Sequence, residues 1–321
     1  MAGADVAVHA DQVPRFGQVE GLRVREDTLF TGAQGQEKRA IRKFAEKALN
    51  RLHEPLQRLL ATDEAILYVA RALAPVSVLE QMTVGWSIYR YMATTLVLTN
   101  KRLLHFTVNP NGAWKRGLRA VAWGDLAQGK ITGGILGRAL LLTYRNGKRD
   151  KYWGLQSRDV KKLRALRNVL HSSSMGQGTG AESMTPLCPS CLNPLQPGNY
   201  ACGRCGQGFK TEASLKKRLL IPGRGYFYIG WGFLGVMTFI FESILLLEVA
   251  VLLIGLAALL ATPSRPVAPN PNGSELAVTL GFFALLIVLE KTLALYHCRR
   301  AVREFIPVAG AGNLAPLGSI S

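Results

Sequence analysis

Four cysteines constrain the fold of this chain more than any other feature. They form two C-x2-C pairs, Cys188-Pro-Ser-Cys191 and Cys202-Gly-Arg-Cys205, with ten residues between the pairs. Each pair can present two thiolates to one tetrahedral zinc ion, and the prolines and glycines around both pairs suit the tight turns of such a site. Four thiolates fill the coordination sphere and leave no open position, so we expect structural Zn²⁺ rather than a catalytic metal.

A pair of disulfides is the alternative use of these cysteines. Disulfides need an oxidising compartment, and Met1 to Ala10 has no basic stretch followed by the apolar run of a secretory signal. Residues 187–210 resemble a short zinc ribbon. Ribbons of this kind occur in nucleic-acid-binding proteins, in protein-binding adaptors and as structural caps, so the resemblance implies a metal without implying a function.

Two apolar runs near the C-terminus each exceed the roughly 20 residues that cross a bilayer core. We expect transmembrane helices over about 236–261 and 276–298, within a membrane region of residues 226–298. The aromatic residues before the first helix suit the headgroup level. The segment Pro222–Gly230 resembles the P-G-x-G-x-x-Y-x-G opening of some small two-span membrane proteins. The length of the first run leaves open whether it holds one span or two.

Basic residues set the expected orientation of these helices. Five precede the first run, three follow the second, and the loop between the runs carries only Arg265. The positive-inside rule then puts both termini in the cytoplasm of a multi-pass protein in a bacterial inner (plasma) membrane. The flanking basic residues are Lys210, Lys216, Lys217, Arg218 and Arg224 on one side and Arg299, Arg300 and Arg303 on the other.

Charged residues inside the apolar runs are expected to have partners, because an isolated charge is costly in hydrocarbon. An antiparallel hairpin places Lys291 opposite a point between Glu242 and Glu248. We predict that Lys291 pairs with one of these glutamates. The alternative is that Lys291 and Glu290 extend towards the cytoplasmic surface.

Between residues 65 and 155 the apolar pattern has the period of two that predicts β-strands. Tight turns are expected at Asn100-Lys101 and at Asn146-Gly147, a strong hairpin signal. Ser157 is expected to cap a closing helix. The expected strands are Ala65–Arg71, Thr94–Thr99, Arg102–Val108, Leu118–Trp123, Lys130–Gly134, Ala139–Tyr144 and Asp150–Leu155.

The stretch Leu96-Val-Leu-Thr-Asn-Lys-Arg-Leu-Leu104 resembles the L-x-L-T-N-x-R-L signature of bacterial PH-like and GRAM-like domains, and the resemblance extends over residues 62–171. It implies a small β-barrel with a closing helix that binds anionic headgroups or peptides without catalysis. Cations in loops would then hold the headgroup, unless they are ordinary solvated charges. The candidates form two clusters: Lys115, Arg116 and Arg119, and Arg145, Lys148, Arg149 and Lys151.

The formal charge of +18 lies entirely before the apolar runs. Residues 1–225 hold 34 Lys and Arg against 16 Asp and Glu, whereas residues 226–321 hold five of each kind. Such an excess predicts an anionic partner. Residues 34–61 place apolar residues at helical spacing among many basic ones, which predicts a basic amphipathic helix. This helix would lie on an anionic membrane or pack against the next domain.

We therefore expect a multidomain α+β membrane protein. No nucleophile, general base or phosphate loop stands out, so an enzyme is not expected. We expect a non-catalytic adaptor that binds membrane lipids or a protein partner. A membrane-tethered nucleic-acid binder and an oligomerising subunit of a membrane complex stay open. The expected parts are a disordered N-terminus (1–33), the basic helix (34–61), a PH-like domain (62–171), a flexible linker (172–186), a zinc ribbon (187–210), a basic juxtamembrane segment (211–225), the membrane region (226–298) and a cytoplasmic tail (299–321).

Overall fold

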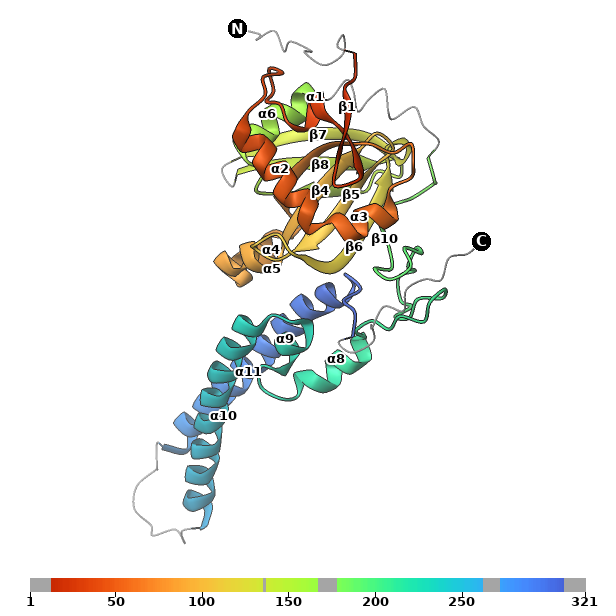
Figure 1. Cartoon of the computed structure of the whole chain (residues 1–321). Helices are drawn as coiled ribbons and strands as arrows, with labels where there is room; N and C mark the ends of the chain where they lie inside the picture. Colours follow the sequence, from red (N-terminus) through yellow and green to blue (C-terminus); the bar gives the residue numbers. More distant parts are fainter. Residues whose placement is uncertain (1–12, 135–136, 167–177, 262–271, 309–321) are drawn as a thin grey trace. The chain divides into compact units, whose positions relative to one another are not determined.

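The computed structural model describes residues 13–134, 137–166, 178–261 and 272–308 (Figure 1). These residues form two compact units. Unit 1 runs to Gln207 and unit 2 begins at Gly208. Unit 1 contains the strands and several short helices, whereas unit 2 is helical. The expected mixed α+β class is therefore confirmed.

Unit 1 is built on a seven-stranded sheet with the order β1-β2-β3-β4-β5-β6-β10. Its neighbours pair antiparallel, except that β2 and β3 meet in parallel at Val24 and Ile66. A second antiparallel sheet has the order β7-β8-β9. The strands of the first sheet are β1 (Phe16–Val19), β2 (Leu22–Arg25), β3 (Ile66–Leu73), β4 (Ala93–Thr99), β5 (Arg102–Val108), β6 (Trp114–Ala122) and β10 (Thr185–Pro186); those of the second are β7 (Leu126–Gly134), β8 (Gly137–Tyr144) and β9 (Arg149–Tyr152).

The strands expected from the period-two pattern are confirmed, with small shifts at their ends. The positions of the turns at Asn100-Lys101, between β4 and β5, and at Asn146-Gly147, between β8 and β9, are confirmed as well. The Gly147 N–H donates to the Tyr144 carbonyl at 3.0 Å, and Gly147 alone of the pair has a left-handed backbone (φ 82°), so the loop is a turn over Arg145-Asn146 closed by a left-handed glycine rather than the expected two-residue turn.

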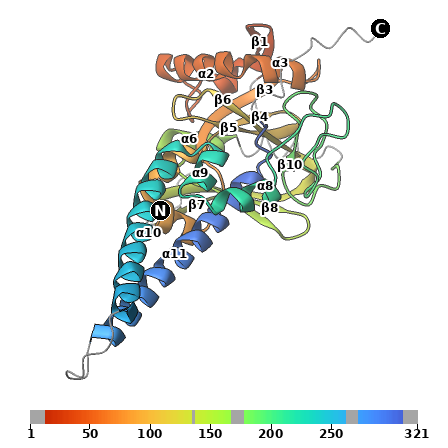
Figure 2. The same ribbon diagram turned by 90° about the horizontal axis from the view of Figure 1, so that it is seen from below.

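Two apolar cores lie on opposite faces of the seven-stranded sheet. Along β4, Leu96 and Leu98 belong to one core and Val97 to the other, because successive strand residues point to opposite faces. The first core is closed by β8, β9 and α6, and the second by α2 and α3. Figure 2 shows these helices and the smaller sheet on either side of the seven-stranded sheet. The central strands are therefore apolar throughout.

The helix expected over 34–61 is two helices, α2 and α3. The chain leaves helical geometry at Leu52 (φ −109°, ψ 9°), because Pro55 has no N–H to donate to the carbonyl of Arg51. Its apolar residues pack against the sheet, so the second of its two expected placements is the one observed. The helices of unit 1 are α1 (Glu26–Leu29), α2 (Arg39–Arg51), α3 (His53–Leu59), α4 (Val78–Val84), α5 (Ile88–Tyr91) and α6 (Ser157–Ala165), with 3₁₀ turns at Gly85–Ser87 and Trp123–Asp125.

Three details of unit 1 differ from expectation. Residues 16–29, expected to be disordered, form β1, β2 and α1. The described strands form two sheets and no closed barrel; the sheets meet at a bridge between Leu73 and Trp153. Gln156, and not Ser157, is the N-cap of α6, and it makes no side-chain capping bond.

A buried lysine ties the N-terminal segment to α6. The side chain of Lys162 is enclosed, and its Nζ donates to Thr31 Oγ1 at 2.7 Å and to the Gly32 carbonyl at 3.1 Å. Burial lowers the pKa of Lys162 to about 7, although the charge of Asp27 acts in the opposite direction. These contacts fix residues 31 and 32, while the preceding segment is held by pairing of β2 with β3 and by burial of Leu22, Val24 and Leu29 in the second core.

Unit 2 contains α8 (Glu212–Leu219), α9 (Arg224–Ile229), α10 (Gly232–Ala261) and α11 (Asn272–Val302). Helices α10 and α11 are long and apolar enough to cross a membrane, and they form an antiparallel hairpin (Figure 1). The first apolar run is thus a short helix followed by a single long one. Residues 208–210 pair with residues 306–308, so the end of the expected ribbon belongs to unit 2. The expected linker and tail lie partly outside the described residues.

We expect the stability of unit 1 to depend on pH through Lys162. The unfolded lysine titrates near 10.5 and the folded one near 7, so the unfolded state binds more protons between these values and stability rises with pH there. Relative to Lys162→Met, the native chain should gain about 2 kcal/mol between pH 7 and pH 9. Unfolding of both full chains in detergent at several pH values measures this, and a constant difference would contradict it.

Candidate metal centre and basic surface

The two C-x2-C pairs fold into turns of matching geometry. In the first, the Cys188 N–H donates to the Asn193 carbonyl and the Leu192 N–H donates to the Cys188 carbonyl, at 2.9 and 2.8 Å. In the second, the Cys202 N–H donates to the Gln207 carbonyl and the Gly206 N–H donates to the Cys202 carbonyl, at 2.9 Å each. Leu192 and Gly206 occupy equivalent left-handed positions, with φ of 61° and 73°. The two cysteine pairs therefore present their sulfurs in the same way.

The four sulfurs gather at one point. Cys188 Sγ lies 3.6 Å from Cys205 Sγ, and Cys191 Sγ lies 3.4 Å from Cys202 Sγ. All four sulfurs lie within 4.8 Å of one another. Tetrahedral Zn–S bonds of about 2.3 Å would separate the sulfurs by about 3.8 Å, so the cluster fits a four-thiolate metal site. All five cysteines of the chain are described, and none forms a disulfide.

The cysteine segment is packed into unit 1 and is not a separate ribbon. Leu187 is buried in the core beneath α2 and α3, and Leu192 packs against the same core. Strand β10 extends the sheet beside β6, and Arg58 of α3 donates to the Ser190 carbonyl. The cysteine cluster therefore holds a segment that covers the β6 edge of the sheet.

An ion pair joins the two long helices of unit 2. Lys291 Nζ lies 2.7 Å from Glu242 Oε2, and the glutamate side chain is only 3% exposed. The same oxygen accepts the backbone N–H of Gly223 at 3.2 Å. Glu248, the other candidate partner, is exposed on α10. The structure thus brings Lys291 to Glu242.

Glycines allow the segment before α10 to approach its neighbours closely. Gly223 is left-handed (φ 65°), and a Cβ there would lie 2.3 Å from the Gly235 carbonyl oxygen. A Cβ on Gly225 would lie 2.5 Å from the Leu219 side chain. The hydroxyl of Tyr226 is 2.9 Å from His297 Nδ1 of α11. The absence of side chains at Gly223 and Gly225 therefore lets α9 pack closely against α8, α10 and α11, which explains the glycines of the Pro222–Gly230 motif.

The predicted headgroup cations do not form two open clusters. Lys148 pairs with Glu182 at 2.9 Å, and Lys151 lies over the Trp153 ring at 3.7 Å. Lys115 Nζ donates to the Arg90 carbonyl at 3.3 Å, and burial together with the Arg90 charge lowers its pKa.

The remaining candidates lie in different environments. Arg119 is half-buried beside the enclosed His105, whose pKa falls to about 3 because of burial and the arginine's charge. Arg116, Arg145 and Arg149 are exposed. Of the seven predicted cations, several therefore already have partners within unit 1.

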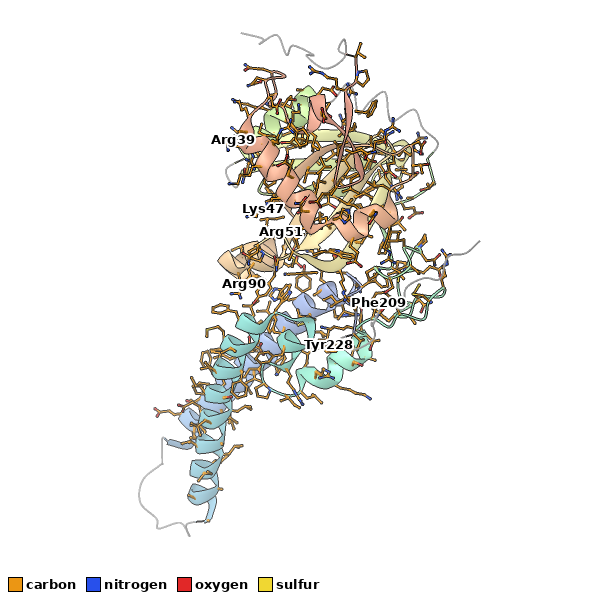
Figure 3. The ribbon with its side chains drawn as sticks, viewed as in Figure 1. Arg39, Lys47, Arg51, Arg90, Phe209 and Tyr228 are labelled. Atoms are coloured by element: carbon orange, nitrogen blue, oxygen red, sulfur yellow. The ribbon has the colours of Figure 1, made fainter. Side chains whose placement is uncertain are left out.

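Four of the basic residues expected on the helix of residues 34–61 form a stripe on α2. Arg39, Lys43, Lys47 and Arg51 recur every four residues and therefore share one helix face. The first three are exposed, and Figure 3 shows Arg39, Lys47 and Arg51 along the same side of α2. Like charges at this spacing disfavour a helix by a few tenths of a kcal/mol per pair. The sequence shows the four-residue spacing of these basic residues. It does not show that this face of α2 is exposed, which follows from the packing of the opposite, apolar face against the sheet.

Comparison with known proteins gives no family for this chain. No family model matches it, and no curated protein matches it. Among solved structures, the C-terminal domain of an unknown protein from Leishmania infantum is 11% identical, with 40% of this chain and 98% of that chain covered and a TM-score of 0.24. A likeness of that size carries no argument about fold or function.

We expect Cys205→Ala to abolish metal binding. The side chain is exposed, so the change leaves little cavity, but it removes one of four ligands. Metal content by mass spectrometry should fall from about one ion per chain to near zero. Amide exchange should rise over residues 186–207 and stay slow in β4 and β5. Cys298→Ala is the control and should keep the metal; an unchanged metal content in Cys205→Ala would contradict the assignment.

We expect Lys291→Leu to destabilise the hairpin of α10 and α11 in lipid by about 3 kcal/mol, because it leaves a buried carboxylate without its cation. Lys217→Leu, the same change at an exposed position of α8 outside the long apolar helices, should change the stability by less than about 0.5 kcal/mol. Reversible unfolding in mixed micelles compares the two variants. Equal stability of the native chain and Lys291→Leu would show that the pair does not hold the helices together.

Proposed function

We propose that this protein is a non-catalytic, membrane-anchored adaptor whose unit 1 binds anionic lipid headgroups. The observation that carries the proposal is the basic stripe of α2. The one acidic residue of that helix, Glu46, pairs with Arg42, which is not a member of the stripe. Each lysine or arginine at an anionic membrane surface contributes about 1 kcal/mol of attraction. Because the apolar face of α2 is buried in unit 1, the attraction is electrostatic and needs no insertion of the helix.

The arrangement of unit 1 supports a PH-like fold as part of this proposal. Four consecutive antiparallel strands, β3 to β6, are followed by three more, β7 to β9, and then by α6. Residues of α6 belong to the core between the two sheets. This order is the one that the resemblance over residues 62–171 implies. Helices α2 and α3 and strands β1, β2 and β10 are then additions around it.

The anchor of the proposed adaptor is the hairpin of α10 and α11. We propose that both helices cross the bacterial inner membrane, with both termini in the cytoplasm. Their length and apolar composition support spanning, and the basic residues at their proposed cytoplasmic ends support the orientation. Anchoring keeps unit 1 at a high effective concentration near lipid, so weak headgroup contacts suffice.

The metal of the proposed adaptor is Zn²⁺ in a structural role. Four thiolates are a ligand set that zinc prefers, and they leave no open coordination position for catalysis. Bound zinc would neutralise the crowded thiolates. Cys188, Cys191, Cys202 and Cys205 would hold it and thereby fix the turns next to β10.

Vesicle binding tests this proposal. The full chain in phosphatidylcholine nanodiscs is mixed at physiological salt with sucrose-loaded vesicles, either neutral or containing phosphatidylserine, and sedimented. We expect binding to the anionic vesicles only, and a reduction of at least about fivefold in Lys43→Glu/Lys47→Glu. Lys161→Glu/Arg164→Glu makes the same charge change at exposed positions of α6 and should bind like the native chain.

Two further results would change the assignment. Loss of binding in Lys148→Glu/Arg149→Glu, with the α2 variant unaffected, would move the headgroup surface to the β8–β9 hairpin. Failure of the native chain to bind anionic vesicles, combined with salt-sensitive binding of an oligonucleotide, would contradict the lipid proposal and favour nucleic acid.

A further inference from the structure

Three arginines from different elements converge beside the C-terminal part of α2. Arg71 of β3 and Arg158 of α6 both lie over the ring of Phe44, with their Cζ atoms 5.2 and 4.5 Å from its centroid. Arg51, in the last turn of α2, and Arg71 both reach the turn between β5 and β6. A Cβ on Gly112 of that turn would lie 2.9 Å from Arg51 Nη1 and 3.3 Å from Arg71 Nη2. We call Arg51, Arg71 and Arg158 the arginine cluster.

The protein neutralises this cluster only in part, through the ion pair of Arg158 with Asp159. Within the described ranges, neither Arg51 nor Arg71 forms an ion pair or a hydrogen bond. The nearby carboxylate of Asp159 already accepts from the Tyr68 hydroxyl at 2.8 Å and lies 3.5 Å from Arg158. Partial burial, followed by the charges of Arg51 and Arg158, lowers the pKa of Arg71, although the charge of Asp159 acts in the opposite direction. A half-buried group of cations of this kind is costly unless an anion joins it.

Gly112 keeps the space between two of these guanidinium groups clear. Its backbone is left-handed (φ 87°), a conformation that other residues rarely adopt, and the residue is buried. Any side chain at this position would occupy the point that Arg51 and Arg71 flank. The turn is fixed by bonds from the Gly112 N–H to the Asn109 carbonyl and from the Ala113 N–H to Asn109 Oδ1.

We propose that the arginine cluster is a binding site for a phosphate dianion, with Arg51 and Arg71 as its ligands and Arg158 as a supporting charge. Guanidinium groups match the oxygens of phosphate with paired, charge-assisted hydrogen bonds, and a dianion can accept from both groups at once. The site shares Arg51 with the α2 stripe but differs from the stripe because three elements of unit 1 define its geometry. It would bind free phosphate whether or not unit 1 meets a membrane, so the inference does not rest on the proposed lipid function.

Phosphate binding by the full chain tests the site directly. The protein in dodecyl maltoside and phosphate-free buffer is titrated with inorganic phosphate by calorimetry, and its Tm is followed in parallel. We expect binding and a rise in Tm for the native chain. Arg71→Gln should weaken binding at least tenfold. Arg71→Lys keeps the charge but loses the planar fork, so it should also weaken binding. Arg145→Gln, an exposed arginine elsewhere on unit 1, is the matched control and should bind like the native chain.

The stability of the variants separates a ligand site from a packing role. If the cluster exists to bind an anion, Arg71→Gln removes an unneutralised charge and should melt at or above the native Tm without phosphate. If Arg71 only packs on Phe44, the variant should melt lower and phosphate should bind unchanged. The absence of phosphate binding by the native chain at millimolar concentration, or equal binding by Arg71→Gln, overturns the proposal.

A lipid and a soluble source of the phosphate are distinguished with vesicles. Nanodisc-embedded chain is sedimented with vesicles that contain phosphatidic acid, a phosphomonoester, or phosphatidylserine, at matched surface charge. Preference for phosphatidic acid that is lost in Arg71→Gln assigns the site to a headgroup. Equal sedimentation with both vesicles, alongside Arg71-dependent binding of inorganic phosphate, assigns it to a soluble phosphate.

Discussion

The need to bury both faces of the central strands β3, β4 and β5 determines the rest of unit 1. These strands are apolar on both sides, so each face of the sheet requires a cover. The smaller sheet and α6 cover one face, and α2 and α3 cover the other. Leu49, Leu52 and Leu56 are buried between these helices and the sheet, so the opposite side of α2 faces solvent. The basic stripe of α2 is therefore a consequence of how the core is closed.

The sequence predicts those features that local chemistry decides. Asn146-Gly147 lies in a hairpin turn because glycine tolerates a left-handed backbone, and the spacing of Cys188, Cys191, Cys202 and Cys205 predicts one shared centre. The pairing of Lys291 with one of two glutamates also follows from hairpin geometry and the cost of isolated charge. The choice of Glu242 over Glu248 depends on helix rotation, which the sequence pattern does not provide.

Features that depend on distant contacts could not be predicted in this way. Residues 16–29 are held by pairing of Val24 with Ile66 and by burial in the second core, and Lys162, more than 100 positions later in the chain, bonds the two residues Thr31 and Gly32 that follow. The arginine cluster combines residues from α2, β3 and α6, so no sequence window contains it. The cysteine turns joined unit 1 because Leu187 enters its core, although the preceding Ser- and Gly-rich stretch predicts independence. In each case tertiary packing overrides a local signal.

The boundary between the units has a consequence for how the chain is made. The described part of unit 1 ends at Gln207, and the first long apolar helix begins only at Gly232. During synthesis the last strand of the sheet and all four cysteines therefore leave the ribosome before α10 does. Since domains fold as units from the N-terminus, unit 1 can close its cores and gather its four cysteines before the first long apolar helix emerges. On the proposed assignments of the cysteine centre and the hairpin, capture of the ion and insertion into lipid are successive events on one growing chain.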